Sequence, residues 1–291
     1  MKVIDAHVHL YPPEVGRDPT AWAAARREPH WATLCARRRR DGLPVQLFPT
    51  VDELLRDMDA AGVEQSVLLG WYWENPATCV WQNRFYAECV RAHPDRLAAF
   101  ATVHPAAGPA ALDEIRRARG DGLIGLGELS PHSQGVPLDD PSWLAILHLA
   151  GELKLPVNLH VTDPQSRRYP GWVETPLCDF VSLAKEFPAT TFILAHWGGG
   201  LAFDAEDRAL QNVYYDTAAS PLLYDDEVWS RAVGTIGAGR ILFGSDNPLR
   251  LYPKTDAGTG MAAFVRELHH AISGEAREEI GAGNARRLLR L

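Results

Sequence analysis

The sequence predicts a single (β/α)8 barrel, in which eight parallel strands alternate with helices around one closed sheet. From residue 50 onward, short apolar segments alternate with amphipathic segments, a pattern typical of strands buried on both faces and covered by helices. Eight such strands can be counted, the number that this barrel requires. No Gly-x-Gly-x-x-Gly turn follows the first strand, so a doubly wound dinucleotide-binding sheet is not indicated.

The individual elements follow from local signals along the chain. Strands are expected at residues 3–10, 65–70, 97–103, 123–128, 156–161, 191–196, 213–217 and 240–244. Thr50 and Glu53 form a capping-box pattern, which predicts a helix that runs to Gly62. Further helices are expected at 83–92, 110–119, 142–153, 176–187, 203–210 and 226–236, and from about residue 258 onward.

The length of 291 residues fits either two average domains or one barrel. No obvious boundary divides the chain, so residues 1–291 are predicted to form one domain. Residues 11–49 are predicted to form a lid-like insertion after the first strand, because long connections in compact domains tend to be functional. Trp22 and Trp31 in this insertion either face a substrate or pack at the surface.

The net charge of -8 argues against general binding to nucleic acid or to anionic membranes, so a small molecule is the expected partner. The basic run Arg37, Arg38, Arg39 and Arg40 opposes this trend. It is interpreted either as a solvated helix end or as a local anion-binding patch.

Cysteine use and the amino terminus both favour a cytoplasmic location. The four cysteines are scattered without close pairs, as expected for reduced thiols: Cys35, Cys79, Cys89 and Cys178. The sequence enters its first strand without an apolar leader, and no run approaches the roughly 18 apolar residues of a membrane span.

Two histidines stand on the first predicted strand. His7 and His9 are two residues apart, so both side chains project from the same face, with Asp5 in the same row. Imidazole is the commonest transition-metal ligand, which suggests a metal site. The alternative is a pair of hydrogen-bonded core histidines, and further ligands at matching positions must decide between the two.

Polar residues also end four later strands. The fourth strand ends in Glu128, the fifth in His160, the sixth in His196 and the eighth in Asp246. Because the carboxyl ends of barrel strands meet on the catalytic face, these side chains should share one basin with the two histidines of the first strand. This nitrogen and oxygen donor set suits zinc, with iron, manganese or cobalt as alternatives.

These motifs resemble the amidohydrolase superfamily of metal-dependent barrels, particularly its amidohydrolase-related (amidohydrolase 2) branch. The resemblance spans the chain and rests on Asp5-Ala6-His7-Val8-His9, Asn158-Leu159-His160, Leu194-Ala195-His196-Trp197-Gly198-Gly199, Phe243-Gly244-Ser245-Asp246-Asn247-Pro248 and Gly283-Asn284-Ala285-Arg286-Arg287-Leu288-Leu289. It implies enzymes that hydrolyse small molecules, including lactonases, as well as non-oxidative decarboxylases and hydratases. It also implies that barrels of this kind often form homodimers.

The resemblance implies one metal ion, held by His7, His9, His160 and Asp246, with His196 as a catalytic or second-metal residue. Glu128 stands where metal-dependent DNases of the same superfamily carry a bridging glutamate. A two-ion arrangement is therefore the alternative: His7, His9 and Asp246 on one ion, His160 and His196 on the other, and Glu128 between them. Glu128 could instead contact substrate or orient a ligand.

Three functions follow as expectations. The first is hydrolysis of a small ester, lactone or amide, in which a metal-activated water loses its proton to Asp246 and His196 stabilises the oxyanion. The second is a lyase, a decarboxylase or hydratase of a small carboxylated, aromatic-derived substrate on the same metal. The third is a metal-binding barrel without catalysis, which a missing ligand would indicate, and none is missing.

Five further residues are candidates for substrate contact. The arginines after strands five and eight could bind a carboxylate, or could be surface residues: Arg167, Arg168 and Arg250. Trp73 and Trp197 lie near strand ends, as do Trp71 and Tyr72, and could face a flat substrate or pack in the core.

Overall fold

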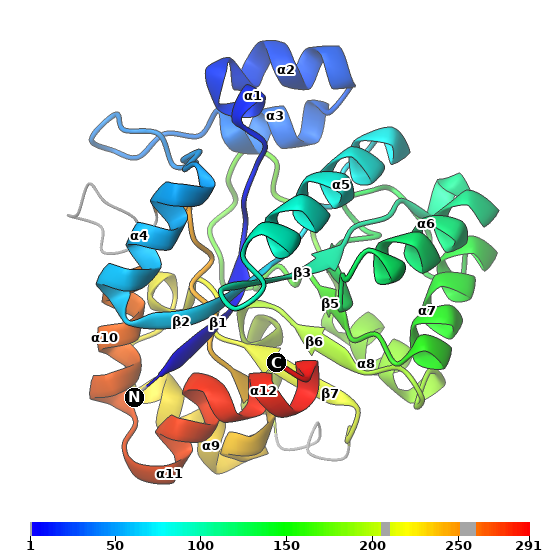
Figure 1. Cartoon of the computed structure of the whole chain (residues 1–291). Helices are drawn as coiled ribbons and strands as arrows, with labels where there is room; N and C mark the ends of the chain where they lie inside the picture. Colours follow the sequence, from blue (N-terminus) through cyan, green and yellow to red (C-terminus); the bar gives the residue numbers. More distant parts are fainter. Residues whose placement is uncertain (1, 205–209, 251–259) are drawn as a thin grey trace.

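The structure is a computed structural model and describes residues 2–204, 210–250 and 260–291. Eight strands form one sheet in the order of the sequence, and each is parallel to the next (Figure 1). They are β1 (Val3–Val8), β2 (Val63–Leu68), β3 (Leu97–Ala101), β4 (Gly125–Leu129), β5 (Val157–Leu159), β6 (Phe192–Leu194), β7 (Val213–Asp216) and β8 (Ile241–Leu242). The predicted barrel is confirmed.

Backbone hydrogen bonds between β1 and the segment after β8 join the two ends of the sheet. The amide of Ala6 donates to the carbonyl of Phe243 at 2.8 Å, and the amide of Asp246 donates to the carbonyl of His7 at 3.0 Å. The amide of His9 then donates to the carbonyl of Asn247 at 2.7 Å. This pairing places Asp246 directly beside the two histidines of the first strand.

Helices surround the strands (Figure 1). Those after the insertion are α4 (Val51–Ala61), α5 (Pro76–Ala92), α6 (Pro109–Gly120), α7 (Pro141–Leu153), α8 (Leu177–Glu186), α9 (Glu227–Ile236), α10 (Met261–Ala271), α11 (Gly274–Glu278) and α12 (Asn284–Leu289). The short turns are η1 (Pro105–Ala107), η2 (His196–Phe203), η4 (Ser220–Leu222), η5 (Ala238–Arg240) and η6 (Glu279–Gly283).

Local capping explains where two of these helices begin. The predicted capping box of α4 is present, since Thr50 and Glu53 each accept a backbone hydrogen bond from the other. Helix α5 begins earlier than the expected residue 83, because Asn75 caps the amide of Ala77 and Pro76 occupies the first turn. The helix expected at 203–210 falls largely outside the described residues. In the part of the chain that is described, no helix is long and apolar enough to span a membrane.

Two apolar layers hold the barrel together. Inside it, the strands contribute Ile4, Val67, Phe100, Ile193 and Leu242, which pack against Ala285 and Leu289 of α12. Between strands and helices, the second layer includes Leu54, Tyr86, Trp143, Phe180 and Trp229. Helix α12 thus covers one end of the barrel and leaves the carboxyl ends of the strands to the site (Figure 1).

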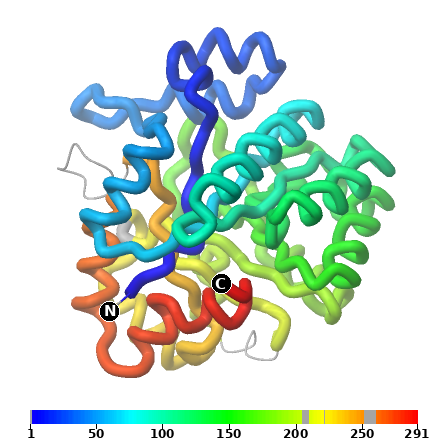
Figure 2. Tube along the Cα trace, in the orientation of Figure 1, coloured from blue at the N-terminus to red at the C-terminus, as the bar shows by residue number. Residues whose placement is uncertain are grey.

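The insertion, residues 11–49, carries α1 (Pro13–Arg17), α2 (Pro19–Arg26) and α3 (Pro29–Cys35). These helices lie together at one end of the barrel, where the chain arrives from β1 (Figure 2). Trp31 is only 2% exposed and packs against the rings of Tyr11, Trp22, Phe48 and Trp73. Trp22 and Trp31 therefore fasten the insertion to the barrel.

Candidate metal centre

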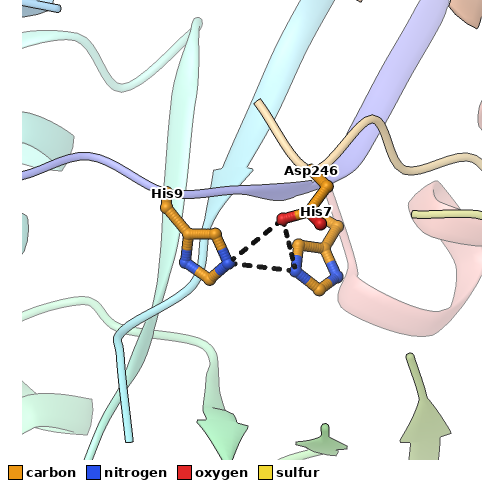
Figure 3. Close-up of side chains that lie close together, drawn as sticks. All are labelled: His7, His9 and Asp246. Carbon is orange, nitrogen blue, oxygen red and sulfur yellow. Dashed lines mark hydrogen bonds and ion pairs between the residues drawn. The ribbon is translucent and has the colours of Figure 1, made fainter. Parts of the chain in front are cut away.

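Three side chains from the two ends of the sheet form a first donor group (Figure 3). The Nε2 atoms of His7 and His9 lie 3.2 Å apart. Asp246 Oδ1 lies 3.8 Å from His7 Nε2 and 3.5 Å from His9 Nε2. The three donor atoms lie close enough together to bind one metal ion, and the two histidines face the same point, as their spacing predicted.

A second donor group comes from β4, β5 and the turn after β6. Glu128 Oε1 lies 2.9 Å from His160 Nδ1 and 3.7 Å from His196 Nε2. The two ring nitrogens, His160 Nδ1 and His196 Nε2, lie 3.3 Å apart. The structure therefore places His160 with Glu128 and His196, and these three residues could also hold a metal ion.

The two groups meet at Glu128. Its second oxygen, Oε2, lies 3.7 Å from His9 Nε2 and 4.0 Å from His7 Nε2. All the sequence-predicted ligands thus share one basin. His7 and His9 lie at its floor and are 0% and 2% exposed, whereas the side chains of His160 and His196 are 15% and 18% exposed.

Asp216 is the main site residue that the sequence analysis missed. It ends β7 and is fully buried. Its Oδ2 lies 2.9 Å from His7 Nδ1 and accepts from Asn158 Nδ2 at 3.0 Å. Its Oδ1 accepts from the backbone amides of His196 at 3.1 Å and Ala218 at 3.0 Å. The available signal was its position, since it is a carboxylate at the carboxyl end of a strand.

The outer nitrogens of the imidazoles fit ligation of a metal. His7 Nδ1 faces the Asp216 carboxylate, and His9 Nδ1 lies 3.0 Å from the carbonyl of Leu69. Both partners are acceptors, so each Nδ1 carries the hydrogen and each Nε2 turns a lone pair towards the other ring. A divalent ion between these nitrogens would satisfy both lone pairs, which is the usual arrangement of metal-ligating histidines.

Carboxylates give the basin a negative field. Burial would lower the pKa of His7, but Asp216, with Glu128 and Asp246, raises it to about 10. Against the same effect of burial, Glu128 and Asp246 raise the pKa of His196 to about 9. Burial would raise the pKa of Glu128, yet the surrounding imidazoles hold it well below its usual range. The field therefore favours bound positive charge.

The backbone at two of these residues is strained. His196 has φ 59° and Asp246 has φ 62°, in the left-handed region that residues with a β-carbon rarely adopt. Gly199, three residues after His196, also has a positive φ of 62°, and a Cβ there would lie 2.9 Å from a side-chain carbon of Val161. The glycines after His196 thus permit the turn that directs its ring into the basin.

A cavity of about 870 Å³ opens onto the basin. Its wall includes the aromatic residues Trp71, Tyr72, Tyr169 and Trp197 and the arginines Arg37, Arg38, Arg39, Arg40, Arg167 and Arg250. The basic run of the insertion therefore lies at the site, which agrees with the anion-patch interpretation.

Two of the five predicted substrate contacts lie elsewhere. Arg168 stacks over the ring of Trp172, at 4.8 Å from its centroid, and is absent from the described cavity wall. Trp73 is fully buried and donates from Nε1 to Gln82 at 2.6 Å within the aromatic cluster. Arg167, Arg250 and Trp197 do line the cavity.

Solved structures resemble this chain over its full length. The 5-carboxyvanillate decarboxylase of Sphingomonas paucimobilis is 18% identical, with a TM-score of 0.75, and 100% of this chain and 99% of that chain are covered. A dihydroxybenzoic acid decarboxylase of Polaromonas sp., with bound manganese and an inhibitor, is 20% identical, with a TM-score of 0.69, and the match covers 100% of this chain and 97% of that chain. The 4-oxalomesaconate hydratase of Rhodopseudomonas palustris is 20% identical, with a TM-score of 0.69, and the match covers 99% of this chain and 95% of that chain. At these identities the likeness shows the fold.

A comparison with curated proteins found no match. The family comparison did: the amidohydrolase-2 family model, described as "Amidohydrolase", matches residues 4–291. The chain therefore belongs to the amidohydrolase-2 family, as the resemblance of its strand-end motifs to that family had indicated.

Proposed function

We propose that this protein is a metal-dependent lyase that removes carbon dioxide from a small aromatic or unsaturated carboxylate. The observation that carries the proposal is the set of six arginines in the wall of the same cavity that is lined by donors of both groups. The net charge of the chain is -8, so this local excess of positive charge indicates an anionic substrate. The neighbouring folds named as decarboxylases and a hydratase support this second expectation better than hydrolysis.

Arg37 is the arginine best placed to receive a substrate carboxylate. Its guanidinium lies 4.6 Å from the ring centroid of Tyr169, and its Nε donates to the carbonyl of Leu34 at 3.0 Å. Within residues 2–204, 210–250 and 260–291, no carboxylate pairs with it. Its terminal nitrogens are therefore available for a bidentate contact with a carboxylate.

Aromatic rings in the same cavity wall suit a flat substrate. The rings of Trp71 and Tyr72 stack with their centroids 4.3 Å apart, and the Tyr72 centroid lies 5.2 Å from that of His160. A planar acid could lie against these faces with its carboxylate directed towards Arg37. This combination of apolar faces and a cation favours an aromatic-derived acid.

The reaction breaks the bond between the ring carbon and the carboxylate carbon. The electron pair stays on the ring carbon, carbon dioxide leaves, and one proton must be delivered to that carbon. Asp246 and His196 border the cavity and are the proposed groups that hold and deliver this proton. A divalent ion on the histidines and carboxylates would supply Lewis-acid stabilisation of the negative charge. The donor set suits zinc, and the manganese in a structural neighbour makes manganese the second candidate.

Product analysis tests the proposal. Purified protein is assayed with dihydroxybenzoates and carboxyvanillate for carbon dioxide, with unsaturated keto acids for water addition, and with lactones and esters for released acid. We expect carbon dioxide from an aromatic carboxylate, and loss of this activity with a chelator. Acid release from lactones alone would instead establish hydrolysis, and an activity that a chelator does not change would refute the dependence on a metal.

Size-exclusion chromatography with light scattering tests the predicted homodimer.

A further inference from the structure

We propose that the substrate carries a second anionic group and that Arg250 binds it. The inference rests on the proposed function in one respect, since it takes an anionic substrate in this cavity as given. Arg37 and Arg250 both line the cavity, and both are half-buried. They reach it from different parts of the chain, because Arg37 belongs to the insertion and Arg250 follows β8. The cavity therefore offers two separate binding points for negative charge.

The chain leaves the charge of Arg250 uncompensated. Its Nε is buried, and no acceptor within the described residues takes its hydrogen. No described carboxylate forms an ion pair with its guanidinium either. A half-buried cation without a partner is costly, so an anion that reaches the terminal nitrogens gains from both charge and hydrogen bonding. Arginine favours a carboxylate in this role because it can bind both oxygens at once.

The backbone holds Arg250 in a fixed position. Its amide donates to the carbonyl of Val45 at 2.7 Å, and its own carbonyl accepts from Arg39 Nη1 at 3.4 Å. Arg39 also pairs through Nη2 with Asp41 at 3.1 Å. These bonds tie the segment after β8 to the insertion. Arg250 is thus placed before a ligand arrives, which lowers the entropy lost on binding.

The acidic residues of the cavity wall have other partners. In the part of the chain that the structure describes, they are Asp41, Glu128, Asp163 and Asp246. Asp41 pairs with Arg39, and Asp163 accepts from the hydroxyl of Tyr224. The other two face the imidazoles of the basin. Neither half-buried arginine meets a carboxylate, so a ligand with one negative charge would compensate only one of them.

The remaining arginines of the wall are less suited to select a substrate. Arg38, Arg40 and Arg167 are exposed, and water screens their charge. They attract anions to the cavity without distinguishing one from another. The cavity itself, at about 870 Å³, lies in the range of sites that hold drug-sized ligands. It has room for a ring with two acidic groups.

Equilibrium binding tests the inference without turnover. The full chain, loaded with Mn²⁺, is titrated by calorimetry with isophthalate and terephthalate, and with their monoamides, which keep the size but carry one charge. We expect at least one dicarboxylate to bind about 10-fold more tightly than its monoamide. Equal affinities within both pairs would overturn the inference and leave the lyase reaction standing. A dicarboxylate preference without carbon dioxide release from any acid would support the second site and count against the lyase.

Variants assign the preference to Arg250. Arg250→Gln should bind the dicarboxylate no more tightly than the monoamide, whereas Arg250→Lys, which keeps the charge, should retain a preference. Arg168→Gln removes the same charge from a residue that stacks on Trp172 and is absent from the described cavity wall, so it should keep the full preference. Circular dichroism checks that each variant is folded. An undiminished preference in folded Arg250→Gln would refute the role of Arg250.

Discussion

The basin and the insertion are built differently. The basin side chains stand at or just after strand ends, are at most 18% exposed, and are anchored by buried hydrogen bonds. The insertion is held by an aromatic cluster and presents half-buried and exposed arginines to the cavity. In the proposed function, the barrel would therefore hold the reacting groups, and the insertion would supply arginines that recognise the substrate.

The basin and the insertion are also held in place by different sets of contacts. Asp216 joins β1, β5 and the turn after β6 through hydrogen bonds to His7, Asn158 and the amide of His196. The insertion touches the barrel through rings and through Glu28, which accepts from the amides of Glu74 at 2.7 Å and Asn75 at 3.1 Å. Changes in one region should leave the other largely intact, which the following variants test.

Asp246→Asn should have the largest effect, because it removes both a metal donor and the proposed proton carrier. We expect a loss in kcat/KM of about 10³-fold or more, and a similar loss for His196→Asn. Asp139→Asn, at an exposed position absent from the described cavity wall, is the matched control. Near-normal turnover in Asp246→Asn, measured with the substrate that the product analysis identifies, would exclude its assigned role.

Trp31→Ala should destabilise the insertion without removing the metal. Loss of a buried indole that contacts four rings costs about 3–5 kcal/mol in the free energy of unfolding. Urea unfolding measures this cost, and limited proteolysis should show cleavage within residues 11–49. Trp172→Ala, on a partly exposed loop, should cost far less. Loss of metal binding in Trp31→Ala would show that the two regions are coupled.

Asp216→Asn should weaken metal binding by about 10–100-fold, since a neutral amide accepts from His7 Nδ1 more weakly than the carboxylate and no longer raises the basicity of the ring. Competition with a chelator measures the affinity, and circular dichroism should show a folded barrel. Unchanged affinity in a folded variant would mean that the geometry of His7 does not depend on the carboxylate.

Arg37→Gln should have the smallest effect of the four. Removing one cation from the cavity wall should raise KM about 10-fold and leave kcat close to that of the parent protein. Arg17→Gln makes the same charge change at an exposed residue of the insertion and should alter neither constant. A fall in kcat with unchanged KM would place Arg37 in the chemistry rather than in recognition.

Loops limited what could be predicted around the site. Trp71, Tyr72 and Trp73 follow β2 in succession, yet only the first two line the cavity. Strand periodicity no longer applies once the chain leaves the sheet, so it could not separate Trp73 from its neighbours. Arg167 and Arg168 diverge for the same reason, because adjacent loop residues have no fixed side-chain direction.

The sequence by itself determined the barrel and the six predicted donors. Strand and helix periods are local properties, and a barrel brings all its strand ends to one face whatever the details of packing. Tertiary structure alone decided how the donors divide: His160 lies with His196, the two oxygens of Glu128 face different groups, and Asp216 supports His7. These relations depend on closure of the sheet and on side-chain rotation, which join residues far apart in the chain and leave no periodic signal.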